Sequence, residues 1–125
     1  QNALSGKSGV SYNLIDDGAS SVLTMEETNN DLKVITITID DFVKEKKLNK
    51  VDFIKQDIEG AELDTLKSSI NTIKQFKPKL AIAVYHEPID FMEIPNFILS
   101  LNLGYKLYLN HYTPNIAETI LFAEV

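Results

Sequence analysis

The segment VDFIKQDIEGAELDTLK, residues 51–67, decides the fold. Residues 51–58 have the composition of a β-strand, and a helical pattern of apolar residues follows. The apolar residues of that pattern recur at steps of three and four: Leu63, Leu66, Ile70 and Ile73. Such spacing gives a helix one apolar stripe, here over about Gly60 to Gln75. The segment therefore predicts a strand that turns directly into a helix packed on a sheet.

A second strand follows this helix. Residues 80–85, LAIAVY, are apolar on both alternating faces, which is typical of a strand covered on each side. Crossovers from strand through helix to strand are right-handed almost without exception and join parallel strands. We therefore expect strands 51–58 and 79–86 to be parallel neighbours, with their carboxyl ends at the same edge.

The flanking segments continue the alternation of strands and helices. Upstream, Val34 to Ile39 is a β-branched strand, and Asp40 and Asp41 offer oxygens to cap a helix from Phe42 to Lys47. Residues 1–33, with Gly18, Ala19 and the polar run 24–33, indicate short strands and loops.

Downstream, Pro95 should open a short helix that stops near Gly104. The last strands, Tyr105 to Tyr112 and Glu118 to Val125, are joined by a turn too short for a crossover helix and should pair antiparallel. The sequence thus predicts one α/β domain, or part of one, over residues 1–125, with a mostly parallel sheet that ends in an antiparallel hairpin.

Composition excludes several classes of function. All twelve cationic residues are lysine, the net charge is −6, and without arginine a nucleic-acid partner is not expected. The absence of cysteine excludes disulfides, thiolate catalysis and cysteine-bound zinc. The longest apolar run is far shorter than the ~20 residues of a membrane span, and residues 1–9 lack the features of a signal peptide. We expect a cytoplasmic chain without a membrane partner.

An acid-rich block, KQDIEGAE, lies where the strand 51–58 turns into its helix. Open α/β sheets bind ligands at this carboxyl edge, so Asp57, Glu59 and Glu62 are candidate functional residues. A structural reading stays open: Asp57 or Glu59 can cap the helix, Glu62 can complement its dipole, and Gly60 can serve a tight turn.

His86 ends the next strand. Neighbouring strands lie ~4.8 Å apart, so its ring should be within reach of Asp57. A carboxylate beside an imidazole can fix its tautomer and raise its basicity, as a general base requires. The alternative is a hydrogen-bonded structural histidine. His111, on the terminal hairpin, should lie farther from Asp57.

Three blocks in the same order resemble the FkbM family of methyltransferases: TIDDFV at 38–43, VDFIKQDIEGAELDTLK at 51–67 and PKLAIAVYHEP at 78–88. The match runs from about Thr36 to the C-terminus. The resemblance implies a class I, Rossmann-like methyltransferase fold that binds S-adenosylmethionine. It also implies methylation of a hydroxyl group on a small molecule or sugar.

The resemblance also implies roles for individual residues. Asp57 would face the methionine end of the cofactor and act in catalysis with His86, while Glu59 and Glu62 would bind substrate. Ala3 lies in a short stretch, NALS, similar to the one beside the adenine. The family's glycine-rich loop and ribose-binding acid have no counterpart in these residues. We therefore expect the C-terminal half of a domain, inactive alone and without a bound metal.

Two other functions stay open. The first is a metal-dependent hydrolase that uses Asp57, Glu59 and His86. The second is a non-catalytic interaction module, consistent with the missing cofactor loop. An uncovered edge of strand 51–58 would also favour a homo-oligomer.

Overall fold

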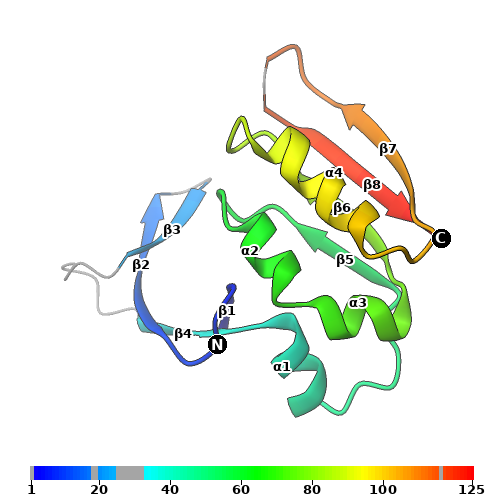
Figure 1. Ribbon diagram of the computed structural model, residues 1–125. Coiled ribbons are helices and arrows are strands. Elements are labelled where there is room, and N and C mark those ends of the chain that lie inside the picture. The colour runs from blue at the N-terminus through cyan, green and yellow to red at the C-terminus, as the bar shows by residue number, and fades with distance from the viewer. Residues whose placement is uncertain (1, 18–19, 25–32, 116) are drawn as a thin grey trace.

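The computed structural model describes residues 2–17, 20–24, 33–115 and 117–125, and for 14–17 and 20–24 only the backbone. These residues form an α/β structure with two mixed sheets and four helices in the described part of the chain (Figure 1). Among the same residues, no helix is long and apolar enough to cross a membrane.

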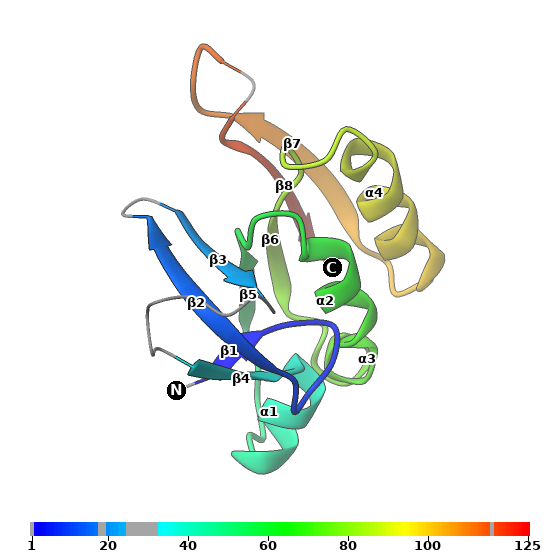
Figure 2. The ribbon, with the colours of Figure 1, turned by 90° about the vertical axis from the view of Figure 1, so that its left-hand side faces the viewer.

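The first sheet is built mainly from the N-terminal region (Figure 2). Its strands are β1 (Asn2–Leu4), β2 (Ser11–Asp17), β3 (Ser20–Thr24) and β4 (Lys33–Ile37), in the order β1-β4-β2-β3. β1 runs parallel to β4, and the other pairs are antiparallel. The expected short strands are therefore present, while Gly18, Ala19 and most of the polar run 24–33 lie outside the described residues.

The second sheet carries the candidate site. Its strands are β5 (Phe53–Gln56), β6 (Lys79–Ala83), β7 (Lys106–His111) and β8 (Thr119–Glu124), in the order β5-β6-β8-β7. The parallel β5–β6 pair and the antiparallel terminal hairpin are confirmed. The expectation of one mostly parallel sheet is wrong, because β4 belongs to the other sheet and β8 inserts antiparallel between β6 and β7.

β5 is an edge strand of the second sheet, so one side of β5 is unpaired within the described residues. Homo-oligomer formation through this edge stays a prediction.

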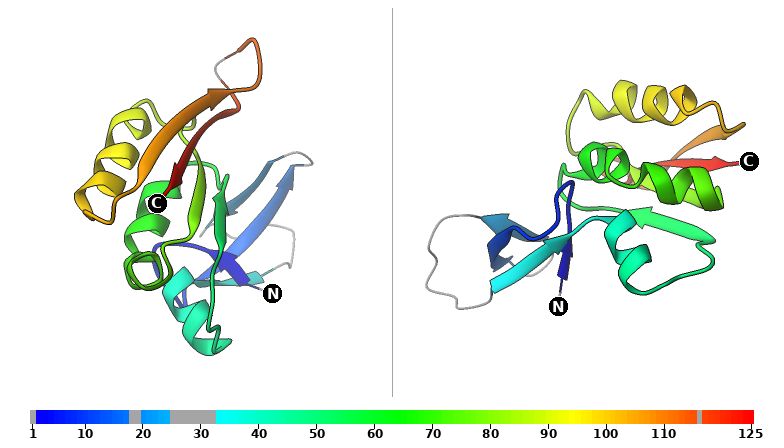
Figure 3. Two further views of the ribbon diagram at one scale, coloured as in Figure 1. Left: turned by 90° about the vertical axis from the view of Figure 1, so that its right-hand side faces the viewer. Right: turned by 60° about the horizontal axis from the view of Figure 1, so that its bottom comes forward.

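Helices α2 (Glu62–Lys67), α3 (Ile70–Phe76) and α4 (Asp90–Ser100) lie over one face of the second sheet (Figure 3). The main core forms between them and the strands, and its fully buried apolar side chains are Leu66, Ile73, Leu80, Ile82, Val84, Ile94 and Ile98. A smaller cluster of Ala81, Ala83 and Ile120 lies apart from this core, with Tyr85 and Phe122 packed against it. The core holds the carboxyl ends of β5 and β6 in place.

The single helix expected over 60–75 is two helices. The hydroxyls of Ser68 and Ser69 donate to the carbonyl oxygens of Thr65 and Leu66, at 2.9 and 2.8 Å. Serine side chains that bond to nearby backbone groups compete with helical hydrogen bonds, which accounts for the break. Lys77, in the left-handed conformation with φ of 47°, ends α3.

The helix after β4 also differs from its expected start. α1 spans Ile39–Glu45, and its N-cap is Thr38, whose side chain accepts a hydrogen bond from the Asp41 amide at 3.1 Å. Asp40 and Asp41 therefore lie inside the helix. Asp41 accepts a hydrogen bond from the Ser8 hydroxyl. This bond is the largest cause of a lowered pKa of Asp41, and a side-chain hydrogen bond with Thr38 is the second.

Asp40 caps a different helix. Its Oδ1 accepts hydrogen bonds from the Thr72 amide and hydroxyl at 2.8 and 2.6 Å. Its Oδ2 accepts from the Asn71 amide and side chain at 3.1 and 2.9 Å. Ser69, the N-cap of α3, makes no side-chain cap bond. Asp40 thus supplies the missing cap and ties α1 to α3.

Replacing Asp40 by alanine should lower the free energy of unfolding by about 1–3 kcal/mol, since the first-turn amides of α3 lose their acceptor. Urea unfolding would measure the change. Asp52→Ala is the matched control, because the Asp52 side chain forms an exposed pair with Lys50, and such pairs contribute about 0–1 kcal/mol. Equal effects of the two substitutions would contradict the capping role.

Pro95 does not open a helix but lies inside α4. The buried residues Asp90, Ile94 and Ile98 follow one another at steps of four, so packing of this stripe extends the helix through the proline. The helix ends at Ser100, before Gly104. Gly104, with φ of 87°, instead turns the chain toward β7.

Candidate functional site

The turn between β5 and α2 has an unusual backbone. Glu59 has φ of 56° and Gly60 has φ of 93°. A Cβ at Gly60 would meet nothing closer than 3.9 Å, so backbone conformation rather than space requires glycine here. The Glu62 carboxylate holds the turn: Oε1 accepts from the Ile58 amide at 2.7 Å and Oε2 from the Gly60 amide at 3.0 Å. Glu62 is fully buried.

Three carboxylates surround the ring of His86. Its Nε2 lies 3.7 Å from Asp57 Oδ1 and 3.6 Å from Glu59 Oε2, and its Nδ1 lies 2.9 Å from Glu62 Oε1. The His86 side chain is 11% exposed, whereas those of Asp57 and Glu59 are 27% and 43% exposed. The structure therefore brings together Asp57, Glu59, Glu62 and His86, as the strand order predicted; their roles stay predictions.

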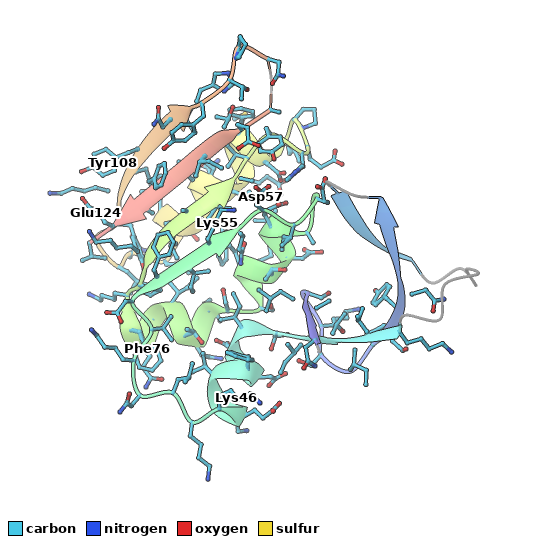
Figure 4. All side chains as sticks on the ribbon, turned by 180° about the vertical axis from the view of Figure 1, so that it is seen from behind. Lys46, Lys55, Asp57, Phe76, Tyr108 and Glu124 are labelled. Carbon is cyan, nitrogen blue, oxygen red and sulfur yellow. The ribbon has the colours of Figure 1, made fainter. Side chains whose placement is uncertain are left out.

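Asp57 is held at the end of β5 by two further groups. The Tyr85 hydroxyl donates to Asp57 Oδ1 at 3.0 Å, and Lys55 Nζ lies 3.6 Å from Oδ2. Figure 4 shows Lys55 and Asp57 in succession at this end of the strand. Burial of the Tyr85 hydroxyl, together with its hydrogen bond to Asp57 and the nearby negative charges, raises the pKa of Tyr85 to about 12. Tyr85 stays a neutral donor to Asp57 at neutral pH.

Sequence reasoning missed Tyr85 and Asp90. Asp90 is buried at the start of α4, and its Oδ2 accepts from the Glu87 amide at 3.2 Å. Burial raises the pKa of Asp90, and the charges of Glu62 and Glu87 act in the same direction. A signal was present: Tyr85 is the last residue of the apolar run, and Asp90 falls in register with Ile94 and Ile98.

The donor atoms of Asp57, Glu62 and His86 lie within 4.8 Å of one another, in an arrangement that a metal ion could occupy. This set contains Glu62 in place of the Glu59 expected from the sequence. Donor atoms bound to one ion at about 2.1 Å lie only about 3.0–3.5 Å apart. Asp57 lies at Nε2 of His86 and Glu62 lies at Nδ1, so one histidine nitrogen does not face both carboxylates.

The remaining candidates lie elsewhere. Ala3 is on β1, where it pairs with Thr36 of β4 in the first sheet. His111 is on β7, and its Nδ1 lies 2.7 Å from Thr119 Oγ1. Neither residue belongs to the cluster around His86.

A family model matches the part of the chain that contains this cluster. The model of the methyltransferase FkbM domain matches residues 2–107, which include the whole cluster. The chain belongs to the FkbM methyltransferase family. A crystal structure of methyltransferase FkbM from Methylobacillus flagellatus is similar to it, with 38% sequence identity and a TM-score of 0.65. No curated protein matches the sequence.

This FkbM chain spans only part of the length of that structure. The similarity covers 73% of this chain but only 23% of the Methylobacillus chain. The family match begins at residue 2, so it includes β1 and the N-terminal sheet as well as the cluster around His86.

Proposed function

We propose that this FkbM segment forms the acceptor side of the active site in an S-adenosylmethionine-dependent methyltransferase with a class I, Rossmann-like fold. Its substrate would be a hydroxyl group of a small molecule or sugar, and its location cytoplasmic. One observation carries the proposal: His86 Nε2 faces Asp57 and Glu59 at the rim where parallel strands β5 and β6 end. That rim is where open α/β sheets bind ligands.

The charge of the rim fits the cofactor. S-adenosylmethionine carries a sulfonium and an ammonium group, and Asp57 and Glu59 offer partly exposed carboxylates to positive charge. We propose that Asp57 holds the methionine end and that Ala3 contributes beside the adenine. When bound, the cofactor supplies an electrophilic methyl group.

The residues of this chain would then orient the acceptor and remove its proton. His86 Nε2 is the proton acceptor, and Asp57, fixed by Tyr85, orients the ring and the hydroxyl. Glu59 has the most exposed of the three carboxylates and would bind the acceptor. Correct alignment contributes ~7–11 kcal/mol, whereas a positioned base adds about 10²- to 10⁴-fold in rate. Positioning therefore dominates.

Metal-dependent hydrolysis has weaker support, because Asp57 and Glu62 lie at different nitrogens of His86 and one histidine nitrogen does not face both carboxylates. A non-catalytic interaction module gives no reason for two carboxylates to face the Nε2 atom of a nearly buried histidine.

The proposal is tested by transfer of a radiolabelled methyl group from S-adenosylmethionine to candidate acceptors in the presence of EDTA. The assay requires a protein that carries these residues and spans the whole family domain, because this chain matches only 23% of its relative. We expect transfer that withstands EDTA. Hydrolysis that EDTA abolishes and Mn²⁺ restores, without methyl transfer, would favour the alternative.

A further inference from the structure

We infer that Glu62 is a positioning residue that keeps the proton of neutral His86 on Nδ1 and thereby leaves the Nε2 lone pair facing Asp57 and Glu59. This inference deepens the proposed function and rests on it for its catalytic meaning. The tautomer itself is a property of the chain that can be measured without any activity.

The contact at Nδ1 selects the tautomer. The atom is buried, and no hydrogen bond with good alignment satisfies it in the described part of the chain. Among the described residues, the Glu62 Oε1 atom lies 2.9 Å from Nδ1 and is an acceptor within hydrogen-bonding distance. An ionised carboxylate accepts hydrogen bonds but donates none, so the proton of this pair must reside on Nδ1.

Glu62 cannot turn away from the ring. It is fully buried in the first turn of α2, and the Ile58 and Gly60 amides hold its two oxygens. The same carboxylate therefore shapes the turn that carries Glu59 and presents a fixed acceptor to His86. This double role accounts for a carboxylate in the core, where a leucine would otherwise be expected.

Among the described residues, the opposite nitrogen has no comparable partner. Nε2 lies 3.7 Å from Asp57 Oδ1 and 3.6 Å from Glu59 Oε2, both too long for hydrogen bonds. These are also the more exposed carboxylates of the cluster, so Nε2 is the nitrogen that an acceptor hydroxyl can approach. Fixing one nitrogen leaves the other free to take a proton.

Nitrogen-15 NMR of the histidine side chains tests this inference on the chain as it is. Spectra recorded at rising pH, until the nitrogen shifts no longer change, would report the neutral ring. We expect a protonated Nδ1 and an unprotonated Nε2 for His86. His111 serves as the second assigned ring. A His86 proton on Nε2 in the unmodified chain would overturn the inference, and this reading requires no variant to fold.

Glu62→Met supplies the second arm. Methionine keeps the length of the side chain but offers no oxygen to accept the Nδ1 proton, so the His86 proton should no longer be held on Nδ1 and a share of it should appear on Nε2. Glu59→Gln is the matched control, because Glu59 faces Nε2 and its loss should leave the proton on Nδ1. An unchanged tautomer in a folded Glu62→Met chain would overturn the inference. Absence of methyl transfer with the expected tautomer would overturn only the proposed function.

Discussion

Replacement of His86 by alanine should lower the rate of methyl transfer by roughly 10²- to 10⁴-fold, the contribution typical of a positioned general base. The imidazole is the proposed proton acceptor, and Asp57 and Glu62 flank its two nitrogens. Removing it leaves alignment of the acceptor largely intact. The loss should therefore appear in kcat more than in KM, measured by single-turnover transfer in a protein that spans the whole domain.

His111→Ala is the control for this substitution. His111 lies on β7 beside Thr119, outside the cluster, so its loss should change the rate little.

Asp57→Asn should also reduce transfer, because the amide keeps the shape but not the charge beside Nε2. A His86→Ala protein with normal kcat would remove the basis for His86 as base.

The location of the site was predictable because it depends on topology. A strand, a helix and a second strand in succession require parallel neighbours with a common carboxyl edge, and Asp57 and His86 each follow one of these strands. No detailed geometry was needed. The 3.7 Å separation of their side chains also depends on the chain after β6, because His86 lies three residues beyond the end of that strand at Ala83.

The polar interior could not be read from apolar periodicity. The sequence pattern placed Leu63 and Ile70 in the buried stripe, yet both are only partly buried. Polar residues are buried beside Leu66 and Ile73 on this stripe: Glu62, Thr65, Ser69 and Thr72. Two of them are buried because they make specific bonds, Glu62 to the turn and Thr72 to Asp40. Such bonds depend on partners that only the folded chain supplies.

Distant partners also explain the shifted helix boundaries. Thr38 caps α1, which frees Asp40 to cap α3, 32 residues beyond it at Thr72. Local rules favoured Asp40 and Asp41 as caps of their own helix. They likewise favoured Pro95 as a first-turn residue, whereas burial of Ile94 and Ile98 sets the position of α4. Tertiary packing decided these boundaries.

Glu62→Ala should lower the free energy of unfolding by about 3–5 kcal/mol, a large fraction of the roughly 5–15 kcal/mol that holds a domain folded. The substitution leaves the Ile58 and Gly60 amides without their acceptor and opens a cavity beside His86 Nδ1. Urea unfolding would measure the loss. One buried carboxylate accepts both turn amides and lies 2.9 Å from His86 Nδ1, where β5 meets α2.

Asp64→Ala is the control for the stability that any acidic side chain contributes near the start of a helix. Asp64 lies two residues further along α2 and is exposed, so its removal should cost less than about 1 kcal/mol through the helix dipole. Glu62→Gln should fall between the two, because its remaining oxygen can accept one of the turn amides. If Glu62→Ala were no more destabilising than Asp64→Ala, the turn would be held by its backbone conformation alone. Glu62 would then not be the group that fixes the positions of Glu59 and His86.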